Sequence, residues 1–144
     1  MSQILNIRPE IKAIEQKIID WRRDFHQYPE LGFEEHRTAS VVAEILSEFG
    51  LNPKTGVGKT GVTADIIFGE GPTIAFRADM DALPIQETSG LAFTSKNDGV
   101  MHACGHDGHM AMLLATVRVL TQMDENLSGT VRFIFQPAEE GGGG

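Results

Sequence analysis

Apolar residues recur at steps of three and four in two stretches near the start of the chain. The first stretch predicts an amphipathic helix that has Pro9 near its first turn and ends at Tyr28, before a proline. Its apolar positions are Ile11, Ile14, Ile18, Trp21 and Phe25. The second stretch predicts a helix over residues 35–49, which Gly50 ends. Its apolar face consists of Val42, Ile45, Leu46 and Phe49.

Three later runs have the composition of β-strands. Residues 61–68 and 73–77 are separated by Gly-Glu-Gly-Pro at 69–72, a sequence typical of a hairpin connection. The run at 130–135 is almost continuously apolar, which predicts a strand that is buried on both faces of its sheet.

A third helix is predicted over residues 108–123, after an irregular segment at 83–99. Its inward positions are Met110, Leu113, Leu114, Val117 and Leu120. Helices that alternate with strands predict an α/β fold, a layered sheet with flanking helices. The 144 residues, 41% of them hydrophobic, suffice for one domain with a core, and nothing in the pattern divides the chain.

Composition limits the surroundings and the partners of the protein. A single cysteine excludes an internal disulfide framework, and the first ten residues lack the features of a signal peptide, so we expect a reducing, cytoplasmic location. No apolar run approaches the ~20 residues that cross a bilayer. The net charge of -8, without a basic cluster, disfavours nucleic acid and anionic membranes as partners.

Candidate metal ligands are concentrated in residues 102–109, which contain three histidines and the only cysteine. Cys104 and His106 can face one centre if the segment is irregular, and Gly105 between them permits a tight turn. A lone cysteine is more often a small buried apolar residue, but the flanking histidines favour ligation here. The roles of His102 and His109 stay open, since His109 could simply cap the following helix or face solvent.

Two other histidines, His26 and His36, lie far upstream, and we expect ordinary surface or packing residues there. Two carboxylates, Glu139 and Glu140, follow the predicted strand at 130–135. Adjacent side chains point to opposite faces of an extended chain. One carboxylate could therefore bind a metal ion while the other accepts a proton from a water beside it.

Two aspartates, Asp79 and Asp81, follow the predicted strand at 73–77. Their i, i+2 spacing lets both point the same way, which suits a ligand site at the carboxyl end of a strand. Asp81 could orient an imidazole ligand. The alternative is a solvated loop with a helix cap.

Residues 56–61 match the pattern G-x-G-x-x-G of dinucleotide-binding loops. That fingerprint leaves a strand and opens a helix, whereas this segment follows a helix and leads into a strand. We therefore expect no nucleotide site there.

Four segments, at 21–33, 76–85, 101–109 and 135–144, together resemble the aminoacylase/carboxypeptidase family of dinuclear metallohydrolases. The match is to its amidohydrolase branch, which contains hippurate hydrolase and the indole-acetyl-amino-acid hydrolases. The resemblance implies that Cys104, His106 and Glu140 are metal ligands, that Glu139 is the general base and that Asp81 supports the site without binding metal. Other branches place a ligand histidine at the position of Asp79, whose role here stays open.

The resemblance further implies a metal-dependent amidohydrolase that cleaves the amide bond of small N-acyl amino acids such as hippurate, with two divalent ions, Zn²⁺ or Mn²⁺. Members of the family are longer and homo-oligomeric, with a lid and dimerisation domain and further histidine ligands. Residues 1–144 are therefore expected to form the N-terminal, incomplete part of a zinc-peptidase-like catalytic domain. A metal-binding fragment without activity is one alternative. A cysteine hydrolase with Cys104 as nucleophile is another, and metal dependence separates the two chemistries.

Overall fold

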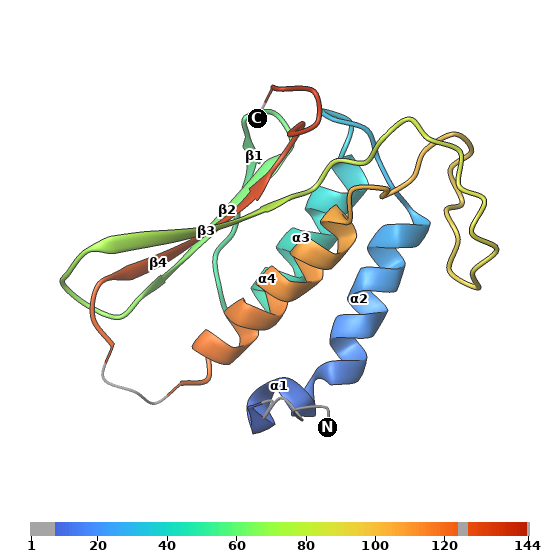
Figure 1. Cartoon of the computed structure of the whole chain (residues 1–144). Coiled ribbons are helices and arrows are strands. Elements are labelled where there is room, and N and C mark those ends of the chain that lie inside the picture. Colours follow the sequence, from blue (N-terminus) through green and yellow to red (C-terminus); the bar gives the residue numbers. More distant parts are fainter. Residues whose placement is uncertain (1–7, 124–126, 144) are drawn as a thin grey trace, which may run out of the picture.

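The computed structural model describes residues 8–123 and 127–143 and shows an α/β fold (Figure 1). Three helices come first and a fourth precedes the last strand. The elements are α1 (Pro9–Ala13), α2 (Glu15–Gln27), α3 (His36–Glu48), β1 (Lys54–Val57), β2 (Gly61–Ile67), β3 (Thr73–Asp79), α4 (His106–Leu120) and β4 (Thr130–Gln136).

The four strands form one mixed sheet in the order β1-β2-β4-β3. β4 is antiparallel to β2 and parallel to β3, and it lies between them in Figure 1. The predicted hairpin between β2 and β3 is therefore wrong. The connection at 69–72 instead bonds to the segment that enters β4, where the Gly129 N–H donates to the carbonyl of Glu70 and the Thr130 N–H to that of Pro72.

The helices cover one face of the sheet. α3 packs over β1 and β2, α4 packs over β3 and β4, and α2 packs mainly against α4. Along β4 the side chains of Val131, Phe133 and Phe135 are buried, whereas Arg132 is exposed and pairs with Asp65 across the outer face. Burial of β4 on both faces was thus a wrong prediction. Its apolar run includes Ile134, which is only partly buried on the outer face.

Three local features depart from the predicted elements. The first helix is interrupted at Ile14, where φ is -113°, so that α1 and α2 are separate. β1, to which the sequence pattern assigned no strand, forms an antiparallel hairpin with β2. The residues that match the dinucleotide pattern make this hairpin and its turn, and no helix follows them.

β3 is an edge strand of the sheet that the described residues form. Ile74 and Phe76 on it are 53% and 43% exposed, and Met112 on the neighbouring α4 is 59% exposed. Among the described residues, none of the helices has the length and apolar character needed to cross a membrane.

Replacing Phe133 with alanine should lower the free energy of unfolding by about 3–5 kcal/mol, because the ring is fully buried beneath the helices and its loss leaves a cavity. Urea denaturation of the 144-residue chain measures this change. The control is Ile67→Ala at a position that is 73% exposed, where the change should stay within about 0.5 kcal/mol. Equal losses in the two variants would contradict the packing described.

Candidate metal site

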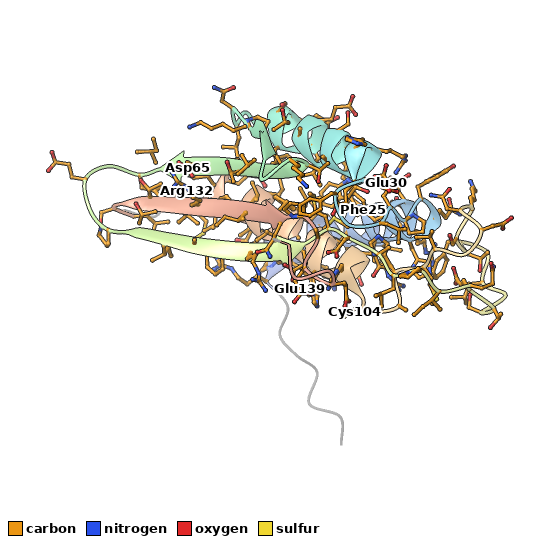
Figure 2. The ribbon with its side chains drawn as sticks, turned by 90° about the horizontal axis from the view of Figure 1, so that it is seen from above. Phe25, Glu30, Asp65, Cys104, Arg132 and Glu139 are labelled. Atoms are coloured by element: carbon orange, nitrogen blue, oxygen red, sulfur yellow. The ribbon has the colours of Figure 1, made fainter. Side chains whose placement is uncertain are left out.

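The candidate site lies at the edge of the sheet where the parallel strands β3 and β4 both end. The Met80 N–H donates to the carbonyl of Gln136, so the two chains leave the sheet side by side. α4 begins at the same edge. Cys104 and Glu139 lie close to one another in Figure 2, at the opposite end of the sheet from Asp65 and Arg132.

Three of the predicted site residues converge at this edge. The Sγ atom of Cys104, a ring nitrogen of His106 and a carboxylate oxygen of Glu140 all lie within 4.8 Å of one another. Cys104 occupies a tight turn, and Gly105 has a φ of +86°, a left-handed conformation that glycine adopts without strain. The structure contains the turn that Gly105 permits, and the expected proximity of these three residues is confirmed.

The imidazole of His106 is held in one orientation. Its Nδ1 atom is 2.8 Å from the backbone carbonyl oxygen of Asp81. A carbonyl only accepts, so in the neutral ring Nδ1 carries the hydrogen and Nε2 keeps its lone pair. Nε2 lies 3.8 Å from a carboxylate oxygen of Glu139 and 3.9 Å from one of Glu140. The lone pair is therefore available to a metal ion among carboxylates.

Glu139 and Glu140 approach the same imidazole, although their adjacent positions predicted opposite faces. That expectation assumed an extended chain, but Ala138 has a φ of +52° and the following residues form a turn. The side chain of Glu139 is 38% exposed and that of Glu140 is 26% exposed. The more accessible carboxylate is thus that of Glu139.

Asp81 supports two of these residues at once. Its carbonyl orients His106, and its carboxylate accepts a 2.9 Å hydrogen bond from the backbone N–H of Glu140. The nearer carboxylate oxygen of Asp81 is 3.5 Å from Nδ1 of His106, so the backbone of Asp81 contacts the imidazole more closely than its side chain does. The other residue of the pair, Asp79, is buried and pairs with Arg77 at 3.1 Å.

Asp79, His106 and His109 form a second group with donor atoms within 4.8 Å of one another. The two groups share His106, which has only Nε2 free to bind a metal ion because Nδ1 is used at Asp81. They are therefore competing arrangements of one imidazole, and His109 is the exposed member of its group.

Negative charge at the site raises the pKa of the Cys104 thiol. The first cause is its hydrogen bond to Glu140, followed by burial and by the charges of Glu140, Glu139 and Asp81. A raised pKa opposes the thiolate that a cysteine nucleophile requires. A divalent cation reverses this effect because it stabilises a coordinating thiolate directly. One buried carboxylate oxygen of Asp81 has no hydrogen-bond partner among the described residues.

His26, expected as an ordinary surface or packing residue, is buried between two carboxylates. Its Nδ1 is 2.7 Å from Asp107, which follows His106, and its Nε2 is 3.2 Å from Glu87 in the irregular segment. Arg22, one helical turn earlier, also bonds to Asp107 at 2.9 Å. The i, i+4 spacing of Arg22 and His26 is the only local signal of this network, since both partners lie more than sixty residues away.

The other two histidines of uncertain role differ in their surroundings. His102 is buried, and neither of its ring nitrogens has a hydrogen-bond partner among the described residues. Burial is the main cause that lowers its pKa to about 4, so the ring is neutral at pH 7. His36 is exposed at the first turn of α3 and takes no part in the site.

The fold and the donor cluster together are those of an α/β protein with a candidate metal site at the carboxyl ends of its parallel strands. Residues 75–144 match the model of peptidase family M20/M25/M40. The chain belongs to this family of metal-dependent hydrolases.

Curated relatives have similar sequences across almost the whole chain. The chain is 48% identical over 135 residues to an N-acyl-L-amino acid amidohydrolase of Geobacillus stearothermophilus, covering 93% of this chain and 36% of the relative. It is 46% identical over 145 residues to thermostable carboxypeptidase 1 of Saccharolobus solfataricus, and this match covers 99% of this chain and 37% of the relative. The chain thus spans little more than a third of the length of these relatives.

A solved structure from Bacillus subtilis, described as a dinuclear metal-binding peptidase of family M20, superposes with a TM-score of 0.85. It is 50% identical, and the match covers 90% of this chain and 37% of that one. A glutaminyl cyclase of Bacteroides thetaiotaomicron is only 17% identical with a TM-score of 0.53, and it shares the fold alone. The resemblance stated from the sequence and the α/β fold class are confirmed.

Stability should fall in acid because of Glu87. Burial alone raises the pKa of this carboxyl, but hydrogen bonds from Ser89, from the Ser95 N–H and from His26 lower it to about 2, against an ordinary value of 4.5. The contribution of Glu87 to the free energy of unfolding is then complete above pH 4.5 and is lost as the pH falls toward 2. Urea denaturation at several pH values should show that the free energy of unfolding falls less in acid for Glu87→Gln than for the unmodified chain.

The exposed Glu44 on α3 provides the control, since Glu44→Gln should lose as much free energy of unfolding in acid as the unmodified chain does. If the unmodified chain and Glu87→Gln lost stability in parallel between pH 4.5 and 2, the hydrogen bonds to Glu87 would not be the cause.

Proposed function

We propose that this chain supplies part of the catalytic domain of an amidohydrolase that cleaves N-acyl amino acids with the help of two divalent metal ions. The observation that carries the proposal is the convergence of Cys104, His106 and Glu140, with the accessible carboxylate of Glu139 beside them. We propose these three residues as ligands and Glu139 as the general base. A thiol and an imidazole favour Zn²⁺, while the carboxylates also suit Mn²⁺.

The donor set suits such an ion on chemical grounds. His106 offers a free Nε2, and the Sγ atom of Cys104 and a carboxylate oxygen of Glu140 lie within 4.8 Å of each other and of a ring nitrogen of His106. Residues that support a ligand by hydrogen bonds are typical of metal sites, and Asp81 does so for both His106 and Glu140.

Metal ions of this kind polarise an amide carbonyl and make water more acidic. Glu139 is the residue that we propose to accept the proton from the attacking water and to deliver it to the departing amine nitrogen. Its side chain lies within 4 Å of the His106 ring and is more exposed than that of Glu140, which allows contact with both water and substrate. The amide bond is then replaced by a free carboxylate and a free amino acid.

The relatives support a substrate class. One is an N-acyl-L-amino acid amidohydrolase and another is an N-acetylcysteine deacetylase of Bacillus subtilis, 51% identical over 134 residues. We infer a small N-acyl amino acid for this protein, with hippurate as a test compound. We also propose a cytoplasmic location and a homo-oligomeric assembly for the whole enzyme. The chain spans about 37% of its relatives, so we expect the 144 residues by themselves to bind metal weakly and to turn over little substrate.

The roles of the two glutamates are separable in a chimera that joins residues 1–144 to the remaining region of the Geobacillus stearothermophilus amidohydrolase. Glu139→Gln should keep its metal content and lose about 10²–10⁴-fold in kcat, because an amide cannot accept the proton. Glu140→Gln should lose metal as well as activity. Mass spectrometry of bound metal and hydrolysis of N-acetyl amino acids measure the two effects.

The matched control is Glu44→Gln, an exposed position on α3 that should change neither quantity. Normal metal content and normal turnover in both Glu139→Gln and Glu140→Gln would refute the proposed roles.

Cys104 should be protected from alkylation by metal in the 144-residue chain itself. The thiol is exposed, so iodoacetamide reaches it, and coordination should slow the reaction in the presence of Zn²⁺. His106→Ala and Glu140→Gln should reduce this protection, whereas Glu44→Gln should not. Alkylation followed by mass spectrometry tests it, and equal rates with and without Zn²⁺ would count against Cys104 as a ligand.

A further inference from the structure

Glu35 is a fully buried carboxylate that the proposed chemistry does not use. It lies at the N-cap of α3, far from Glu139 in the sequence. One carboxylate oxygen accepts a 2.8 Å hydrogen bond from the backbone N–H of Ala138. The other accepts a short hydrogen bond from the hydroxyl of Thr60 in the β1–β2 turn. Both oxygens of a buried charge are therefore bonded, which offsets the cost of removing that charge from water.

The residue that Glu35 holds is in an unusual conformation. Ala138 has a φ of +52°, which a residue with a side chain seldom adopts, and it immediately precedes Glu139. The turn is closely packed, since a Cβ atom on Gly32 would lie 2.9 Å from that of Ala138. The left-handed conformation persists only where the surroundings hold it in place.

The backbone on each side of Glu139 is bonded to a buried carboxylate. Glu35 accepts from the N–H of Ala138, and Asp81 accepts from the N–H of Glu140. These two acceptors come from the start of α3 and from the end of β3. Between them they fix the direction in which the side chains of Glu139 and Glu140 leave the turn.

We propose that Glu35 is a positioning residue that holds the Ala138–Glu140 turn so that Glu139 and Glu140 face His106. This inference rests on the proposed function of that turn. The N-terminus of α3 favours a negative charge on Glu35, and the hydroxyl of Thr60 keeps its second oxygen occupied. Glu35 thereby couples the helix layer and the β1–β2 turn to the candidate metal site, although it does not contact the site itself.

Glu35→Leu removes both acceptor oxygens at similar volume, whereas Glu35→Gln keeps a carbonyl oxygen that can still accept from Ala138. Thr60→Val removes only the hydroxyl. The controls are Glu34→Gln, at the exposed neighbouring residue, and Thr63→Val, the same change on β2. All are made in the 144-residue chain, and folding is checked by circular dichroism.

The first readout is a titration with Co²⁺, whose visible bands report the number of ligands and whose near-ultraviolet charge-transfer band reports the thiolate. For Glu35→Leu we expect about a 10–100-fold loss of Co²⁺ affinity with the thiolate band retained, as for Glu140→Gln. Glu35→Gln should match Glu34→Gln. Thr60→Val should weaken Co²⁺ binding more than Thr63→Val does. If Glu35→Leu does not fold, the comparison of these two threonine variants decides whether the proposal holds.

The second readout is hydrogen exchange of the Ala138 and Glu140 amides without metal, followed by NMR. The Ala138 amide should exchange faster in Glu35→Leu and stay protected in Glu35→Gln. Unchanged exchange and unchanged Co²⁺ binding in a folded Glu35→Leu variant would overturn the positioning role, and so would a Glu35→Gln variant as impaired as Glu35→Leu.

Failure of the proposed function gives a different result. If Cys104→Ala, His106→Ala and Glu140→Gln all bound Co²⁺ as the unmodified chain does, or if that chain bound none, the metal site would be wrong. The exchange of the Ala138 amide would then decide by itself whether Glu35 holds the turn.

Discussion

The parallel pairing of β3 with β4 is the constraint on which the candidate site depends. Parallel strands end at the same edge, so the residues that follow β3 and those that follow β4 leave the sheet together. Asp81 is thereby placed beside Glu140, although 58 residues lie between them. The crossover that parallel pairing requires includes the irregular segment and α4, and α4 begins with His106 at this same edge.

Buried polar groups then determine the geometry at that edge. The chain makes sharp turns at Gly105 and Ala138, whose φ angles are +86° and +52°. The carbonyl of Asp81 accepts from His106, while the carboxylates of Asp81 and Glu35 accept from the turn that bears Glu139. Each interaction satisfies a group that is costly to bury alone, and together they orient an imidazole and two carboxylates toward one point.

A further set of interactions holds the start of α4 from the opposite side. His26 and Arg22 on α2 bond to Asp107, and His26 also reaches Glu87 in the irregular segment. The start of α4 and the irregular segment are therefore both bonded to α2. These buried hydrogen bonds give the irregular segment a defined position, while the second carboxylate oxygen of Asp107 has no partner among the described residues.

Periodicity in the sequence predicted the α/β class and most of the helices and strands, because helical and strand repeats are local properties. The clustering of ligand-type residues, together with the family resemblance, made Cys104, His106, Glu139 and Glu140 candidates for the site. The order of the sheet was decided by tertiary structure. A hairpin between β2 and β3 was locally plausible, but β4 offers Val131, Phe133 and Phe135 to the helices and takes the central position. The same holds for His26 and Glu35, whose roles depend on partners that are distant in sequence and become neighbours only when the layers pack.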